Sequence, residues 1–274
     1  MISIPTAVAN DYFKWQLDLF WYNHKLVYGR DASSKAFAIV INKDNVNDQV
    51  IKSLNWSIDI PYQLCNSFYD ELNITHELGI LKPINIQIGL AQIIEAFDDN
   101  ETIEIIDCDQ FHLKCYDEVA VNTDELFVST VYEDWHLKSL SDYRYVIEPY
   151  FLNNGQYYNG GFEPIIGKVK TFKKILKDWI TIHRQIVDTN TGLVQWWAGM
   201  YSLSAACERN KVQMISKDMC YIPNLNQPID EHHCCHYSVD PIFNKRTFPD
   251  IDISKFPNNI FYNRTKEWLT KYQS

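Results

Sequence analysis

Two aspartates one residue apart, Asp107 and Asp109, are the strongest candidates for chemistry in this sequence. They follow Ile103, Ile105 and Ile106, whose pattern indicates a buried strand that ends where the aspartates begin. Two carboxylates this close raise each other's pKa unless a cation lies between them. We therefore expect a divalent metal ion here, with solvated turn aspartates as the alternative.

Ligand chemistry narrows the choice of metal. Carboxylate oxygens without a set of Cys and His ligands suit Mn²⁺ or Mg²⁺, ions that usually keep positions open for phosphate oxygens. The chain also contains a control, because Asp250 and Asp252 form the same triplet in FPDIDIS. Chance supplies about one or two such triplets. No buried strand leads into the second triplet, so we expect it to be an ordinary polar loop.

The patterns around the first triplet predict an α/β fold. The run KAFAIVIN predicts a strand over residues 35–42. Apolar spacings of three and four residues predict helices over residues 12–26, 84–97 (directly after Pro83), from about Lys168 onward, and 192–210. Alternating strands and helices are typical of parallel sheets, which bind ligands beyond the carboxyl ends of their strands. The first aspartate pair lies at such an end.

Composition limits the class of protein. The 274 residues are 46% hydrophobic with a formal net charge of -10, which fits a soluble globular domain and argues against nucleic acid or an anionic membrane as the main partner. We find no membrane span, no secretory signal and no linker that would divide the chain. The seven cysteines form no CxxC pair, which favours reduced thiols and a cytoplasmic location.

Short blocks along the chain resemble the hydroxyproline arabinosyltransferase and peptidyl-serine galactosyltransferase group of GT-A fold glycosyltransferases. They are NDYFKWQ (10–16), KPINIQIGL (82–90), IIDCDQFHL (105–113), YNGGFEPIIG (158–167), WAGMYSLSAAC (197–207) and HYSVDPIFNKR (236–246). The resemblance implies one GT-A-like, Rossmann-like domain over residues 1–274, with a mostly parallel sheet flanked by helices. Residues 1–115 would bind the nucleotide sugar and residues 116–274 the acceptor.

The same resemblance implies an activity and roles for single residues. The enzyme would move a sugar from a nucleotide-sugar donor, most commonly a UDP-sugar, to a hydroxyl of a glycan or protein. In GT-A enzymes a histidine near the C-terminus completes the metal's ligands, and the pair His236-Tyr237 looks like that element. His233 is the fallback ligand, and a plain loop histidine is the alternative. Lys245 or Arg246 would offset the charge of the departing diphosphate.

The histidines and cysteines at 232–236, HHCCH, also invite a zinc interpretation. Neighbouring residues of an extended run point to opposite faces, so these five cannot converge on one ion. The paired spacing of zinc ligands is absent too. We therefore expect no structural zinc site from this run alone.

Substrate contacts are expected at positions from both halves of the chain. Glycines before the third predicted helix permit close approach of the backbone to a ligand, with a structural glycine turn as the alternative. An aromatic side chain there can pack on a sugar, although aromatics are more often core residues. The expected substrate-binding residues are Val40, Ile41, Asn42, Lys82, Asn85, Asn159, Gly160, Gly161, Phe162, Trp197 and Lys245.

Activation of the acceptor is left open by the sequence. Enzymes of this class often have a carboxylate near residues 195–199, which read QWWAG here. A retaining enzyme can use a leaving phosphate oxygen instead of a general base, so retention is slightly favoured over inversion. Otherwise Glu163, Asp188 or Asp134 is the base.

Three alternatives to an active transferase remain. One is an inactive relative, and another is a non-catalytic carbohydrate-binding or structural protein. A sugar nucleotidyltransferase usually has a glycine-rich loop at its first strand, which AFAIVINKDN lacks. The missing membrane anchor differs from the Golgi-resident plant enzymes of the resembling group and favours a microbial or viral relative, acting in the host cytoplasm if viral.

Overall fold

The computed structural model describes most of the residues of the chain. They are 1–42, 59–66, 81–116, 119–129, 144–152, 162–190, 193–221, 232–237, 242–245 and 247–272. None of the helices in these ranges has the length and apolar character that a membrane span requires.

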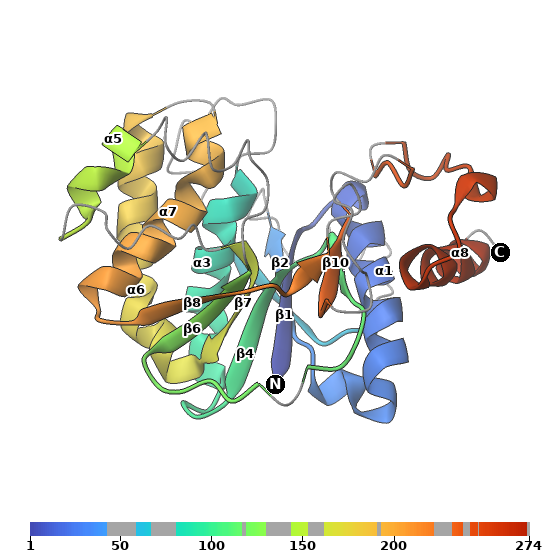
Figure 1. Cartoon of the computed structure of the whole chain (residues 1–274), viewed down its shortest axis with the longest axis horizontal. Helices are drawn as coiled ribbons and strands as arrows, with labels where there is room; N and C mark the ends of the chain where they lie inside the picture. The colour runs from blue at the N-terminus through green and yellow to red at the C-terminus, as the bar shows by residue number, and fades with distance from the viewer. Residues whose placement is uncertain are drawn as a thin grey trace.

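A seven-stranded, mostly parallel sheet forms the centre of the fold, with strand order β3-β2-β1-β4-β7-β6-β8 (Figure 1). Only β7 runs antiparallel to its neighbours in this sheet. The strands are β1 (Ile2–Val8), β2 (Ala38–Asn42), β3 (Tyr62–Asn66), β4 (Thr102–Asp107), β6 (Glu125–Ser129), β7 (Phe162–Lys168) and β8 (Gln213–Lys217). The predicted α/β fold with a mostly parallel sheet is confirmed.

Helices cover both faces of this sheet, as Figure 1 shows, and a small second sheet lies on the face of α1. One face carries α3 (Leu81–Ile93), α6 (Val169–Thr189) and α7 (Leu193–Arg209), and the other carries α1 (Asp11–Tyr28), with α8 (Ile260–Tyr272) outside it. The small sheet has the order β5-β10-β9, from β5 (Gln110–His112), β10 (Cys234–His236) and β9 (Cys220–Tyr221). Short helices are α5 (Arg144–Ile147), η1 (Gly29–Ser34), η3 (Ile94–Ala96), η4 (Glu148–Tyr150) and η6 (Ile253–Lys255).

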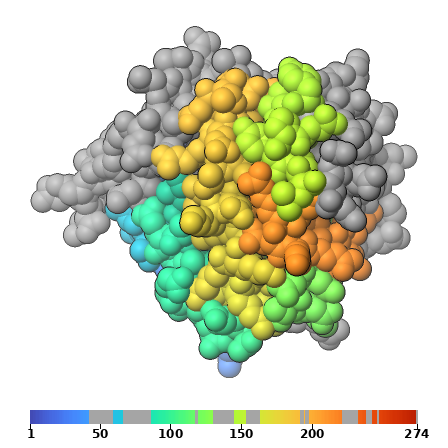
Figure 2. All heavy atoms as spheres, turned by 90° about the vertical axis from the view of Figure 1, so that its left-hand side faces the viewer, coloured from blue at the N-terminus to red at the C-terminus, as the bar shows by residue number. Residues whose placement is uncertain are grey.

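The four predicted helices are present as α1, α3, α6 and α7. The predicted spacing in α6 is confirmed, since Val169, Phe172, Leu176, Trp179 and His183 are all buried. Figure 2 shows the opposite side of α6 running along the middle of one face of the molecule. Helix formation here follows from the amphipathic pattern, because burial of the apolar stripe provides most of a helix's stability.

Three details of the elements differ from expectation. The strand β1 precedes α1, so the predicted strand over residues 35–42 is the second strand of the sheet and not the first. Residues 162–168, for which no strand was predicted, form β7. The helix α3 begins at Leu81, before Pro83 instead of after it, which is possible because a first helical turn tolerates proline.

The strand register brings several chain segments to one edge of the sheet. Thr6 pairs with Asp107, and Val8 of the same strand pairs with Ile41. The carboxyl ends of β1, β2 and β4 therefore share an edge, and the antiparallel β7 begins there. The edge is the place where a ligand of a parallel sheet is expected.

The C-terminal helix α8 is fastened to α1 and β5. Arg264 Nη1 donates hydrogen bonds to Asn23 Oδ1 at 2.8 Å and to the His112 carbonyl at 3.1 Å, and Asn23 also donates to that carbonyl. Apolar contacts join the same elements, because Trp15 and Trp268 belong to one buried aromatic cluster. The C-terminal helix thus holds strand β5, which follows β4.

Candidate active site

The two aspartates and the predicted histidine meet at the end of β4. The chain turns directly after Asp107 and continues into β5, whose Gln110 pairs with His236 of β10. One ligand atom from each of Asp107, Asp109 and His236 lies within 4.8 Å of the others. His236 Nε2 is 3.4 Å from Asp109 Oδ1.

A lysine from the C-terminal part of the chain contacts the same aspartate. Lys245 Nζ forms an ion pair with Asp109 Oδ2, and the two side chains are 18% and 3% exposed. Asp109 is therefore a buried member of a charged group, which disfavours the alternative of solvated turn aspartates. Asp109 thus contacts both the Lys245 ammonium group and the His236 imidazole.

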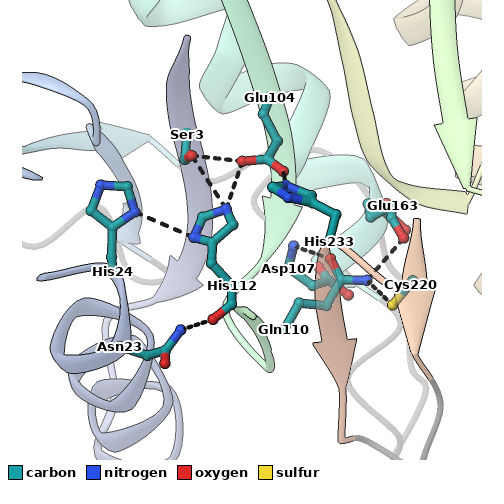
Figure 3. A network of polar contacts seen from close by, with 10 residues as sticks. All are labelled: Ser3, Asn23, His24, Glu104, Asp107, Gln110, His112, Glu163, Cys220 and His233. Carbon is teal, nitrogen blue, oxygen red and sulfur yellow. Dashed lines mark hydrogen bonds and ion pairs between the residues drawn. The ribbon is translucent and has the colours of Figure 1, made fainter. Parts of the chain in front are cut away.

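Gln110 fixes the turn that carries the aspartates. Its Oε1 accepts a hydrogen bond from the Asp107 backbone N–H at 3.1 Å, and its Nε2 donates to the Glu163 carbonyl at 2.9 Å (Figure 3). The end of β4 is thereby joined to the start of β7. Sequence reasoning missed this residue, which directly follows the triplet.

Tyr237 is a buried, uncharged residue next to His236. Burial raises the pKa of Tyr237 well above its ordinary value, and the charge of Asp109 adds to this effect. The phenol stays protonated and donates a hydrogen bond to the Cys108 carbonyl at 3.5 Å. It therefore supports the turn without adding charge.

The donor set fits a hard divalent cation. Two carboxylates and one imidazole can hold Mn²⁺ or Mg²⁺, with room in the coordination shell for phosphate oxygens. The control triplet behaves differently: Asp252, with a side chain 54% exposed, pairs with Lys255 at 3.3 Å and accepts from the Ser254 N–H at 3.1 Å. The second triplet is a polar loop, as predicted.

The expected substrate positions of the N-terminal part lie on elements that end or begin at this edge. Val40 and Ile41 are fully buried in β2, so their side chains belong to the core and only their backbone could meet a nucleoside. Asn42 ends β2, and Lys82 and Asn85 lie in the first turns of α3. The side chains of these three polar residues fall outside the described part of the structure, and all five positions remain predictions.

The expected positions of the C-terminal part are only partly described. Glu163 is half-buried in β7 and offers its carbonyl to Gln110, and Asp188 is exposed near the end of α6. Phe162 starts β7 and Trp197 lies in α7, but their side chains are not among the described residues. Outside the described residues altogether are Asp134, Asn159, Gly160, Gly161 and Arg246.

A second polar group lies near the first, closer to the start of strand β4, and was not predicted. Glu104 of β4 accepts hydrogen bonds from His112 Nε2 at 2.8 Å and from His233 Nε2 at 2.6 Å (Figure 3). The fallback ligand His233 thus belongs to this group and not to the pair of aspartates. Burial alone would raise the pKa of Glu104, but the charges and hydrogen bonds of the two histidines hold it well below its ordinary value. Glu104 was recognisable in sequence as a charged residue between two buried isoleucines.

Comparison with known proteins identifies the fold but not a family. No protein family matches the sequence, and no curated protein matches it either. Among solved structures, an active-site mutant of LgtC is similar over 99% of this chain and 96% of its own, with a TM-score of 0.56 and 12% identity. The galactosyltransferase LgtC in complex with donor and acceptor sugar analogues has a TM-score of 0.55 and 13% identity, with the same coverage.

A third similar structure is the bifunctional glycosyltransferase WbbM in its apo form. It has a TM-score of 0.55 and 10% identity, and the match covers 98% of this chain and 49% of that one. At such identities the similarity is one of fold. The chain has the GT-A-like fold of these glycosyltransferases, and the resemblance to the arabinosyltransferase and galactosyltransferase group remains a prediction.

Proposed function

We propose that this protein is a metal-dependent glycosyltransferase that moves a sugar from a nucleotide-sugar donor, with UDP as the favoured base, to a hydroxyl of a glycan or protein. One observation carries the proposal: Asp107, Asp109 and His236 converge within 4.8 Å at the carboxyl end of β4. They do so on a fold that this chain shares with glycosyltransferases over nearly its whole length.

The residues divide the work of binding the donor. Asp107, Asp109 and His236 would hold Mn²⁺ or Mg²⁺, and the bound ion would supply Lewis-acid stabilisation of the diphosphate leaving group. Lys245 is already held against Asp109 and adds a positive charge beside the place where the diphosphate develops its negative charge. Gln110 keeps the turn in place, so that these groups are preorganised before the donor binds.

The acceptor hydroxyl would be held at the same edge of the sheet, where β7 begins. Positioning of the two reactants contributes much of the rate in such reactions. Glu163 is the second residue of β7 and so lies at this edge. It is the favoured base if the anomeric centre is inverted, with Asp188 second. We keep retention as slightly favoured, because residues 195–199 contain no carboxylate.

Nucleotide binding gives the sharpest test. The thermal stability of the protein would be measured with UDP, GDP, ADP and CDP, each with Mn²⁺ and with EDTA. A nucleoside diphosphate at a hundred times its Kd should stabilise the protein by about 2.7 kcal/mol, and only when the metal is present. If no nucleoside diphosphate stabilises the protein with Mn²⁺, the proposal is wrong.

Two other outcomes identify the alternative functions. Sugar binding that EDTA leaves unchanged, without consumption of any UDP-sugar, would indicate a non-catalytic carbohydrate-binding protein. Release of pyrophosphate from a nucleoside triphosphate and a sugar phosphate would indicate a nucleotidyltransferase. Each assay uses the full chain and needs no variant.

A further inference from the structure

We propose that Glu104, His112 and His233 form a second metal site, close to the aspartate site. It would bind Zn²⁺ or a similar divalent transition-metal ion. One ligand atom from each of the three side chains lies within 4.8 Å of the others, and all three side chains are buried. This group shares no residue with Asp107, Asp109 and His236. The inference concerns ion binding and does not depend on the proposed transferase activity.

The donor set distinguishes this group from the aspartate site. One carboxylate and two imidazoles are a known ligand set for zinc, whereas Mg²⁺ and Ca²⁺ prefer oxygen ligands. The aspartate site has two carboxylates and one imidazole, so its ligand set is richer in oxygen and better suited to a hard ion such as Mg²⁺. The two groups should therefore select different ions from a mixture of Zn²⁺ and Mg²⁺.

The three side chains already point at one another from separate segments. His112 Nε2 and His233 Nε2 contact opposite oxygens of the Glu104 carboxylate, at 2.8 Å and 2.6 Å. Zinc bonds of about 2.0–2.2 Å in tetrahedral geometry require ligand atoms roughly 3.3 Å apart. The His112 ring would need to withdraw by about 0.5 Å and the His233 ring by about 0.7 Å to accept the ion.

Outer contacts hold two of the ligands in the orientation that a metal requires. Ser3 Oγ donates a hydrogen bond to Glu104 Oε2 at 2.6 Å. His24 Nδ1 lies 3.3 Å from His112 Nδ1, which leaves His112 Nε2 directed at the carboxylate (Figure 3). At this distance His24 Nδ1 can accept the Nδ1–H of a metal-bound His112. Such second contacts are the usual support of metal-binding histidines.

The two groups are carried by the same three segments. Glu104 lies three residues before Asp107, Asp109 three before His112, and His233 three before His236. An ion bound by Glu104, His112 and His233 would hold β4, β5 and β10 together. The same segments supply Asp107, Asp109 and His236, so this ion would help to position the ligands of the aspartate site.

Metal analysis of the wild-type protein tests the inference first. The protein would be folded in the presence of Zn²⁺, Mn²⁺ and Mg²⁺, dialysed against EDTA, and analysed by inductively coupled plasma mass spectrometry. We expect about one equivalent of zinc per chain to remain, because release of a fully buried ion requires local unfolding. Protein that is folded and retains no transition metal after this treatment would overturn the inference.

Variants then assign the ion to its residues. Glu104→Gln and His233→Gln should lose the zinc, while His236→Gln should retain it and lose only the Mn²⁺-dependent effect of nucleotides. The reverse pattern would place the zinc at the aspartate site and refute the second site. If the first two variants fail to fold, Co²⁺ substitution of the wild type decides: intense visible bands indicate a tetrahedral site, and spectra of six-coordinate Co²⁺ refute it.

Discussion

Replacement of Asp109 by asparagine tests two contributions of this side chain. One is to folding stability, and the other is to the binding of Mn²⁺ with a nucleoside diphosphate. The change keeps the shape of the residue and removes the charge that Lys245 and His236 contact. We expect a loss of folding stability in the absence of ligands. We also expect the stabilisation by Mn²⁺ and a nucleoside diphosphate to disappear.

The size of the first loss follows from burial. Removal of one partner from a fully buried ion pair costs about 3–5 kcal/mol, because the remaining charge is left without compensation. The Lys245 side chain is 18% exposed and can turn its ammonium group toward water. The smaller cost of about 1–3 kcal/mol for an unpaired buried group is therefore the expected value.

The second loss is independent of the first. Wild-type protein gains about 2.7 kcal/mol from a ligand at a hundred times its Kd. Without the charge of Asp109 the metal loses a ligand atom, and this increment should fall close to zero. The measurement is urea unfolding with Mn²⁺ plus UDP and with EDTA, for both proteins.

Asp250→Asn is the matched control, because Asp250 is an exposed member of the second aspartate triplet. We expect it to change folding stability by less than about 0.5 kcal/mol and to leave the ligand increment intact. An Asp109→Asn protein that keeps the full increment would show that this carboxylate does not hold the metal. The assignment of the site would then have to be abandoned.

Three more predictions test the fold and the site. Gly89→Ala should destabilise the protein by about 1–2 kcal/mol in urea unfolding, because the new Cβ would lie 2.3 Å from Ile39 Cγ2. This overpacking outweighs the gain in helix propensity. If an added Ile39→Ala change recovers none of the lost stability, overpacking against Ile39 is not the cause. Burial lowers the pKa of His183 from 6.5 to about 3, so the unfolded chain binds a proton that the folded chain does not, and stability falls as the pH drops below 6.5. His183→Leu should remove about 1.4 kcal/mol per pH unit of this dependence between pH 6 and pH 4, and unchanged pH dependence would contradict the assignment. Glu163→Gln should lower kcat by about 10²–10⁴ if Glu163 is the general base, and Asp188→Asn should then change it by less than about threefold; equal effects would exclude Glu163 as the base.

Sequence patterns predicted the helices better than the strands, for a physical reason. The helices α1, α6 and α7 have apolar stripes long enough to be recognised. The strand β1 contains Pro5 beside two polar residues, Ser3 and Thr6, and a proline usually argues against a central strand. β7 contains Pro164 and Gly167, which also read as loop residues. Both strands form because neighbours on each side bury them, and no local pattern reports that.

The site could be predicted only where its residues are close in sequence. Asp107 and Asp109 were found because a buried strand leads directly into them. The ion pair of Asp109 with Lys245 joins residues 136 positions apart, and its partner was inferred from a family resemblance. The group around Glu104 was missed because His233 is 129 residues away. Convergence of this kind is a property of sheet topology, and residue spacing does not contain it.

The distance along the chain between these partners has a consequence for synthesis. A nascent chain that has passed residue 129 contains the strands β1 to β4 and both acids of the turn, but neither His236 nor Lys245. Until the last quarter of the polypeptide leaves the ribosome, the acids must rely on water and free ions to offset their repulsion. Donor binding should therefore appear abruptly, late in translation, when the segment that carries these two residues docks.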